Sequence, residues 1–143
     1  MLENQFKKIL VTLDGSPNSI RGLNEAISLA RQSKGIITGI HVINLFPPEY
    51  STNLRKYKIQ LTKNARKYME HAKFIAGRNG IDYVEKITAS KNPVDTIVGF
   101  AKKGKFDIIV IGSRGLGSSK AQYIGSVAHG VVNDSRTPVL IVK

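Results

Sequence analysis

Residues 112–125 combine the features that a phosphate-binding loop requires. Gly112 and Gly115 can adopt positive φ angles, and without a Cβ they let a ligand approach the main chain closely. Gly125 and Ser126 stand where hydrophobic spacing predicts that a helix begins. The free N–H groups and the positive dipole end of such a helix attract an anion. The stretch therefore predicts an anion-binding loop that ends on a helix N-terminus.

Polar side chains in the same stretch strengthen this prediction. Ser113 and Ser126 supply hydroxyl donors, and Arg114 and Lys120 supply positive charge. The glycines follow the order G-x-x-G-x-G and no Gly-Lys-Ser/Thr comes after them, so the loop is neither a G-x-G-x-x-G motif nor a Walker A motif. A flexible surface connection is the alternative interpretation. The length of the stretch, its spaced glycines and the helix start favour a nucleotide site.

The hydrophobic pattern switches repeatedly between strand-like and helix-like spacing. We expect strands at residues 6–13, 36–43, 83–89, 108–111 and 139–142, with helices at 17–34, 52–78, 93–103 and 126–134. This alternation predicts one α/β domain over residues 1–143, with an open parallel sheet and helices on both of its faces.

A second chemistry-bearing turn, Asp14-Gly15-Ser16, follows the first expected strand. In an open parallel sheet, ligands bind beyond the carboxyl ends of the strands, where the winding direction reverses. Because the Asp14 turn and the Gly112 loop each follow an expected strand, both are expected at this ligand-binding edge of the sheet. The alternative role for Asp14 is an Asx-turn or a helix cap, which is compatible with ligand contact.

These residues resemble the ATP-binding subgroup of the universal stress protein family. Gly112-x2-Gly115-x9-Gly125-Ser126 matches that subgroup's signature, G-2x-G-9x-G-[ST]. The segments ILVTLDGS at 9–16, DIIVIGSRG at 107–115 and TPVLIVK at 137–143 are similar to the family in the same order, so the resemblance covers nearly the whole chain. Two features depart from it: no glycine precedes Pro93, and Gly130 lies inside an expected helix, at a cost of about 1 kcal/mol relative to Ala.

The resemblance implies a Rossmann-like, adenine nucleotide alpha hydrolase-like fold with strand order 3-2-1-4-5. That order would place the reversal between the first and fourth strands, so the Asp14 turn and the Gly112 loop would flank one crevice. The resemblance implies that ATP or AMP binds, with Mg²⁺ or Mn²⁺, and that the main chain at Val42 reads the adenine. It also implies a homodimer formed through residues 139–142. The predicted nucleotide-binding residues are Asp14, Val42, Gly112, Ser113, Arg114, Gly115, Gly125, Ser126 and Val127.

The function expected from this resemblance is a dimeric, nucleotide-dependent sensor or adaptor in the stress response. No catalytic residue is assigned, because no general base is evident in the sequence. Asp14 with a metal ion would permit slow ATP hydrolysis, so a metal-dependent hydrolase stays open as an alternative. The metal-binding residues cannot be assigned from the sequence.

Charge raises a different possibility. Lys and Arg number 22 against 10 Asp and Glu, a net charge of +12, which attracts anionic partners. Residues 55–67 place a run of cations on one helix face: Arg55, Lys56, Lys63, Arg66 and Lys67. Nucleic-acid binding is the alternative, but no RRM, KH or helix-turn-helix pattern accompanies the face. A solvated helix face is favoured.

Composition excludes several other classes. With 0 Cys, disulfide scaffolds, zinc–thiolate sites and cysteine nucleophiles are ruled out. The longest apolar run, residues 108–111, is far too short to span a membrane, and no secretory signal is visible, so a cytoplasmic protein is expected. His41, His71 and His129 fall on separate elements, which favours surface or hydrogen-bonded roles over a metal cluster.

Overall fold

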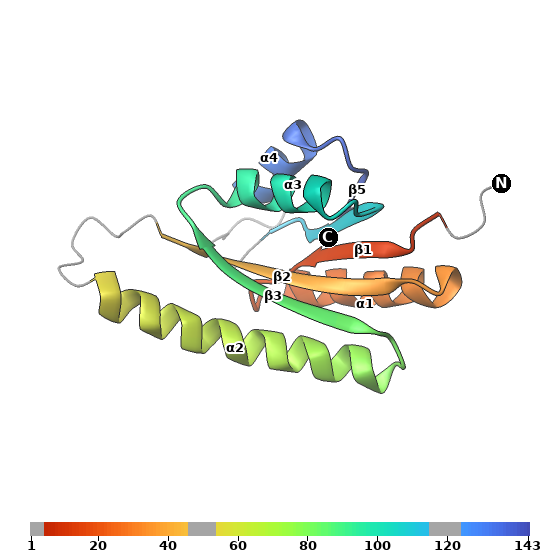
Figure 1. Ribbon diagram of the computed structural model, residues 1–143, viewed down its shortest axis with the longest axis horizontal. Coiled ribbons are helices and arrows are strands. Elements are labelled where there is room, and N and C mark those ends of the chain that lie inside the picture. Colours follow the sequence, from red (N-terminus) through yellow and green to blue (C-terminus); the bar gives the residue numbers. More distant parts are fainter. Residues whose placement is uncertain (1–4, 46–53, 115–123) are drawn as a thin grey trace.

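The computed structural model describes residues 5–45, 54–114 and 124–143, and in these ranges strands and helices alternate strictly (Figure 1). The elements are β1 Lys8–Thr12, α1 Pro17–Ser33, β2 Ile36–Asn44, α2 Leu54–Arg78, β3 Tyr83–Ser90, α3 Pro93–Lys103, β4 Ile108–Gly112, α4 Ser126–Asp134 and β5 Val139–Val142. The elements expected from the hydrophobic pattern are confirmed, with boundaries that differ by a residue or two.

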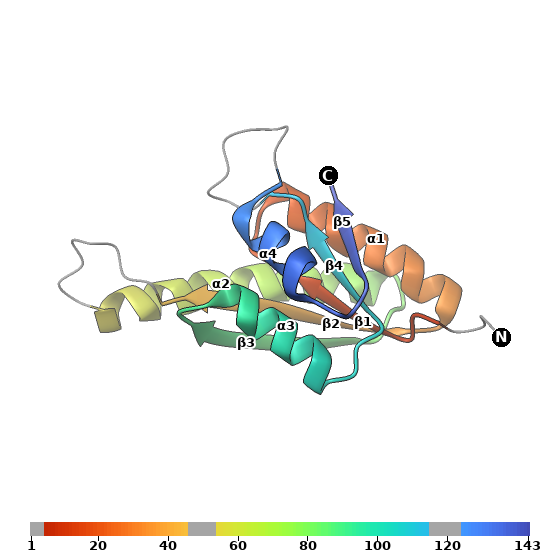
Figure 2. The ribbon, with the colours of Figure 1, turned by 90° about the horizontal axis from the view of Figure 1, so that it is seen from above.

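The five strands form one parallel sheet in the order β3-β2-β1-β4-β5. Strand β1 lies at the centre, where Val11 pairs with Gly39 of β2 on one side and with Val110 of β4 on the other. Helices α1 and α2 cover one face of the sheet, and α3 and α4 cover the opposite face (Figures 1 and 2). The winding direction therefore reverses between β1 and β4, and the strand order 3-2-1-4-5 implied by the family resemblance is confirmed.

Two hydrophobic cores form because neighbouring strand residues point to opposite faces. Ile9 and Val11 of β1 pack beneath α1 and α2, whereas Leu10 packs beneath α3 and α4. All three side chains are fully buried. Since burying one such side chain stabilises the fold by about 1.5–3 kcal/mol, the central strands are held firmly, and the loops at their carboxyl ends start from fixed positions.

Local backbone chemistry sets the ends of α1. The Ser16 hydroxyl accepts a hydrogen bond from the Ser19 amide at 3.1 Å and caps the first turn. At the other end Lys34 takes the left-handed conformation, with φ 56°. Position 35 has no room for a side chain, because a Cβ on Gly35 would stand 2.7 Å from the carbonyl oxygen of Phe6.

Helices α3 and α4 lie side by side and approach closely at Gly130 (Figure 2). A Cβ on Gly130 would stand 2.7 Å from Cγ2 of Val94 on α3. The glycine that the sequence marks as unfavourable within a helix is therefore explained by helix packing.

No helix in the described part of the chain is both long and apolar enough to cross a membrane.

Candidate functional site

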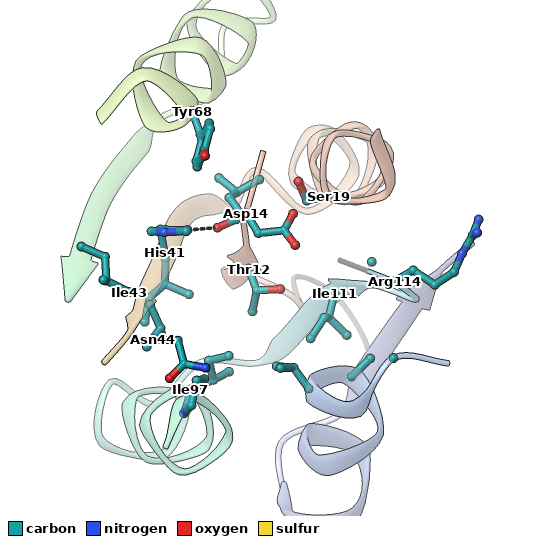
Figure 3. A pocket seen from close by; sticks show the side chains of 18 of the residues that line it. Thr12, Asp14, Ser19, His41, Ile43, Asn44, Tyr68, Ile97, Ile111 and Arg114 are labelled. Atoms are coloured by element: carbon teal, nitrogen blue, oxygen red, sulfur yellow. Dashed lines mark hydrogen bonds between the residues drawn. The ribbon is translucent and has the colours of Figure 1, made fainter. Parts of the chain in front are cut away.

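A pocket of about 720 Å³ opens beyond the carboxyl ends of β1, β2 and β4 (Figure 3). Its walls come from strands that are distant in sequence but adjacent in the sheet, and from helices on both faces. The strands contribute Thr12, Leu13 and Asp14 at the end of β1, Ile40 to Asn44 of β2, and Ile111 to Arg114 at the end of β4. The helices contribute Ser19 of α1, Tyr57, Leu61 and Tyr68 of α2, Pro93 and Ile97 of α3, and Gly125 to Ala128 at the start of α4.

The pocket brings together nearly all of the predicted nucleotide-binding residues. Asp14, Val42, Gly112, Ser113, Arg114, Gly125, Ser126 and Val127 line it. Gly115 lies outside the described residues, so the structure does not place it. The expectation that the Asp14 turn and the Gly112 loop flank one crevice is therefore confirmed as geometry.

The polar end of the pocket is built around the start of α4. The Gly125 amide donates to the Ser113 carbonyl at 2.6 Å, which joins the end of the loop to the end of β4. Gly125 is the N-cap residue, and it has no side chain with which to cap the first turn. The N–H groups of that turn, at Ser126, Val127 and Ala128, therefore have no side-chain cap, and these residues line the pocket.

Gly112 and Ser113 are positioned by α1. Gly112 does not take the positive φ that the sequence suggested; instead, a Cβ there would stand 2.9 Å from the main-chain carbon of Asn18. The close approach is made by α1, not by a ligand. The side-chain amide nitrogen of Asn18 donates to the Ser113 hydroxyl at 3.0 Å, and both side chains are buried. Arg21 donates to the Asn18 side-chain oxygen and to the Lys143 carbonyl, which links this end of the pocket to the chain beyond β5.

Arg114 lies at the rim of the site, and its predicted role in nucleotide binding stays a prediction. It lines the pocket, but its side chain points away from Asp14 and Ile111 (Figure 3). Its Nε is buried, with no hydrogen-bond partner. The structure therefore gives no direct support to Arg114 as a cation aimed at the centre of the pocket.

The turn after β1 forms the opposite wall. Asp14 Oδ1 accepts a hydrogen bond from the Ser16 amide at 2.9 Å, which is the Asx-turn named as its alternative role, and Asp14 also lines the pocket. Gly15 has φ +84°, a conformation that favours glycine. The ring of Tyr68 packs so closely against Gly15 that a Cβ there would stand 2.7 Å from Cδ1 of the ring.

His41 supports the same turn from β2. Its Nδ1 lies 2.6 Å from the Leu13 carbonyl oxygen, and since a carbonyl only accepts, Nδ1 carries the proton. Its ring meets Tyr68 edge-on, with centroids 5.6 Å apart. His41 is thus a hydrogen-bonded histidine, as expected. In the described residues, no three His, Cys, Asp or Glu side chains gather into a possible metal site.

The sequence analysis missed the apolar end of the pocket. Tyr57 and Leu61 of α2 line it, and so do Asn44 of β2 and Ile97 of α3 (Figure 3). Hydrophobic spacing places Tyr57 and Leu61 on the apolar side of the helix expected at residues 52–78, and such a side usually packs on a core. The pocket therefore has a polar, N–H-rich end at α4 and an apolar end between α2 and α3.

Fold and pocket together define a doubly wound α/β domain with a crevice at its reversal point, lined by the uncapped start of α4. The sequence profile described as "Usp: Universal stress protein family" matches residues 5–143. Universal stress protein YxiE of Bacillus subtilis is 32% identical, over 96% of this chain and 99% of that protein. The chain belongs to the universal stress protein family.

Two solved structures share the fold over nearly their whole length. Hypothetical protein MJ0577 superposes with a TM-score of 0.82 at 28% identity, covering 97% of this chain and 96% of that one. A universal stress protein described in complex with cAMP superposes with a TM-score of 0.75 at 26% identity, covering 97% and 98%. The Rossmann-like architecture expected from the sequence is confirmed.

Proposed function

We propose that the pocket binds an adenine nucleotide, ATP or AMP, and that the protein works as a cytoplasmic, nucleotide-dependent sensor or adaptor in the stress response. The observation that carries the proposal is the uncapped start of α4, which lines the polar end of a cavity whose other end is apolar. A nucleotide has the same division, with an anionic tail and a flat, weakly polar base. A relative of the same fold is described in complex with cAMP, which supports an adenine nucleotide as the ligand class.

The polarity of the pocket sets the orientation of the bound nucleotide. The phosphates would meet the N–H groups at Ser126 and Val127 and the hydroxyl of Ser113, where a helix N-terminus favours negative charge. The base would lie between Tyr57 and Ile97, against the main chain at Val42.

A Mg²⁺ or Mn²⁺ ion would bind mainly through the phosphates. Mg²⁺ is commonly held by one or two carboxylates together with substrate phosphates. Asp14 is the single carboxylate among the described lining residues, so it fits that minimal requirement. The ion would supply charge neutralisation at the phosphates. The alternative is that the protein slowly hydrolyses ATP. Measuring phosphate release at saturating ATP with Mg²⁺ or Mn²⁺ tests this alternative.

We also propose that a second copy of the chain pairs along β5. This strand is at the edge of the sheet, and its four residues, Val139–Val142, are apolar and half-buried. An exposed apolar edge strand invites pairing, and a dimer would cover it. Sedimentation velocity with and without nucleotide measures the dimer and its dependence on the ligand.

Calorimetric titration with ATP, AMP and cAMP tests the binding proposal. In Ser126→Asp, a carboxylate stands at the start of α4, and we expect affinity to fall about tenfold or more through like-charge repulsion. Val132→Asp introduces the same charge into the same helix, at a residue outside the pocket lining that is 44% exposed, and should leave affinity unchanged. Equal loss in both variants, or no binding by the parent protein, would contradict the proposed site.

A further inference from the structure

The solvent-facing side of α2 carries a strong excess of positive charge. Its exposed cations are Arg55, Lys56, Lys58, Lys63, Arg66, Lys67, Lys73 and Arg78, against one carboxylate, Glu70. The opposite side of the helix packs on β2 and β3 through fully buried residues such as Met69 and Ala72 (Figure 1). The charges therefore sit on a helix whose orientation is fixed by the core.

An exposed aromatic ring stands among these cations. Phe74 is 61% exposed, and the guanidinium of Arg78 lies over its ring at 5.9 Å from the centroid. A hollow of about 360 Å³ lies here, lined by Phe74, Arg78, His71, Ile75 and Asn79. One strip of the helix carries Lys63, Lys67, Phe74 and Arg78, because these residues follow one another at helical spacings of four, seven and four.

We propose that this strip, together with Arg66 and here named the α2 outer face, binds single-stranded nucleic acid. The cations would contact successive phosphates over about 22 Å of helix, from Lys63 to Arg78. The Phe74 ring would stack on one base. Stacking on an exposed ring requires an unpaired base, which favours a single strand over a duplex.

Charge and apolar distribution favour nucleic acid over a membrane. A helix that lies on a membrane presents a continuous apolar stripe to the lipid. On the outer side of α2, the well-exposed large apolar residues are Ile59 and Phe74, which lie fifteen positions apart. The apolar stripe of α2 packs against the sheet instead. A polyanion with flat, unpaired rings matches isolated aromatic and cationic groups better than acyl chains do.

The charge contribution is tested by anisotropy titration of a fluorescent 15-nucleotide oligo(dT) from 50 to 200 mM salt. Each phosphate contact to a single strand adds about 0.7 to the slope of log affinity against log salt, so Lys63→Gln, Arg66→Gln and Lys67→Gln together should reduce the slope by about 2. The matched control neutralises three exposed cations at the far end of α3: Lys102→Gln, Lys103→Gln and Lys105→Gln. An equal reduction in the control would show that net charge alone drives binding, and would overturn the proposal.

The stacking contribution is tested at Phe74. Phe74→Ala should weaken binding roughly 5- to 150-fold while leaving the salt slope unchanged, because stacking is lost and the phosphate contacts remain. The sequence has no Trp, so Phe74→Trp supplies a single indole whose emission should be quenched by the oligonucleotide. Unchanged affinity in Phe74→Ala and unquenched Phe74→Trp would both contradict a stacked base.

Three further outcomes separate this surface from its alternatives. Ser126→Asp, which damages the nucleotide pocket, should leave oligonucleotide binding intact, and a parallel loss would place the strand in the pocket instead. A duplex of the same length should bind more weakly, and equal binding would overturn the single-strand assignment. Binding to vesicles of anionic lipid without binding to the oligonucleotide would assign the surface to membranes.

Discussion

Replacing Gly15 by alanine probes the wall of the pocket where the structure is tightest. Gly15 has φ +84°, and the ring of Tyr68 stands against it. The residue before it, Asp14, turns into the pocket, and the Leu13 carbonyl is held by His41. A methyl group at position 15 therefore meets both an unfavourable backbone conformation and an aromatic ring that is itself packed on His41.

Both penalties can be estimated from the geometry. A residue with a Cβ in the left-handed region costs about 1–2 kcal/mol relative to its usual conformations. The distance of 2.7 Å to Cδ1 of Tyr68 is well inside the roughly 3.5–4.0 Å at which carbon atoms attract one another. Overpacking of this kind costs about 1–3 kcal/mol. We expect Gly15→Ala to lower the free energy of unfolding by about 2–5 kcal/mol.

Urea unfolding at 25 °C in a double-mutant cycle separates the two penalties. In a Tyr68→Ala background the ring is gone, so Gly15→Ala should cost only the backbone part, about 1–2 kcal/mol. Calorimetry on the folded single variant should also show weaker nucleotide binding, because the Asp14 turn is displaced. If Gly15→Ala costs the same with and without the Tyr68 ring, the packing argument is wrong.

Two further predictions concern buried contacts elsewhere. Gly99→Ala, in a helix with open space around it, should stabilise the protein by about 0.5–1 kcal/mol. Gly130→Ala has the same helix gain but also the contact with Val94, so it should be less stable than Gly99→Ala by about 1–3 kcal/mol; thermal unfolding compares them. Burial, and secondarily Glu85, raises the pKa of Tyr83, whose hydroxyl is buried without a partner. As pH rises above about 10, the unfolded chain loses the Tyr83 proton before the folded protein does, so the free energy of unfolding falls. Tyr83→Phe should remove the share of this decrease that comes from Tyr83. Urea midpoints from pH 8 to 11, compared between the two proteins, measure that share.

The fold and one end of the pocket could be predicted from the sequence because local signals agree there. Ser16 before a proline marks the start of α1, and the apolar run at residues 108–111 marks a central strand. Asp14 and Gly112 both lie at the ends of strands, and parallel strands bring their carboxyl ends to one edge of the sheet. The strand order, which makes these two ends neighbours, followed from the family resemblance and not from the local pattern.

The apolar end of the pocket could not be predicted in the same way. Tyr57 and Leu61 share a helical arc with Ala65 and Met69, so periodicity treats all four as core. In the structure Ala65 and Met69 are fully buried, whereas Tyr57 is 37% exposed and lines the cavity with Leu61. Periodicity identifies the inward face of a helix but not where the sheet beneath it ends.

Glycine roles were predicted least well, because they depend on distant partners. Gly112 was expected to leave room for a ligand, and its space is taken by Asn18. Gly130 was expected only to weaken its helix, and it allows Val94 to approach. Each partner lies on another helix and comes from an earlier part of the chain, so no local pattern could reveal either contact.

Helix α2 carries both proposed ligands on different parts of its length, and this predicts that they bind independently. Tyr57 and Leu61, which line the nucleotide pocket, lie near the N-terminal end of the helix. The α2 outer face begins at Lys63, over the part whose inward residues, including Met69, are fully buried against the sheet. Because that part is packed on the sheet away from the pocket, saturating AMP should change oligonucleotide affinity by less than about twofold, and by linkage the oligonucleotide should change AMP affinity by the same factor. Anisotropy with AMP and calorimetry with oligonucleotide measure the two factors. A reciprocal change of tenfold would show instead that the whole helix moves when the pocket is filled.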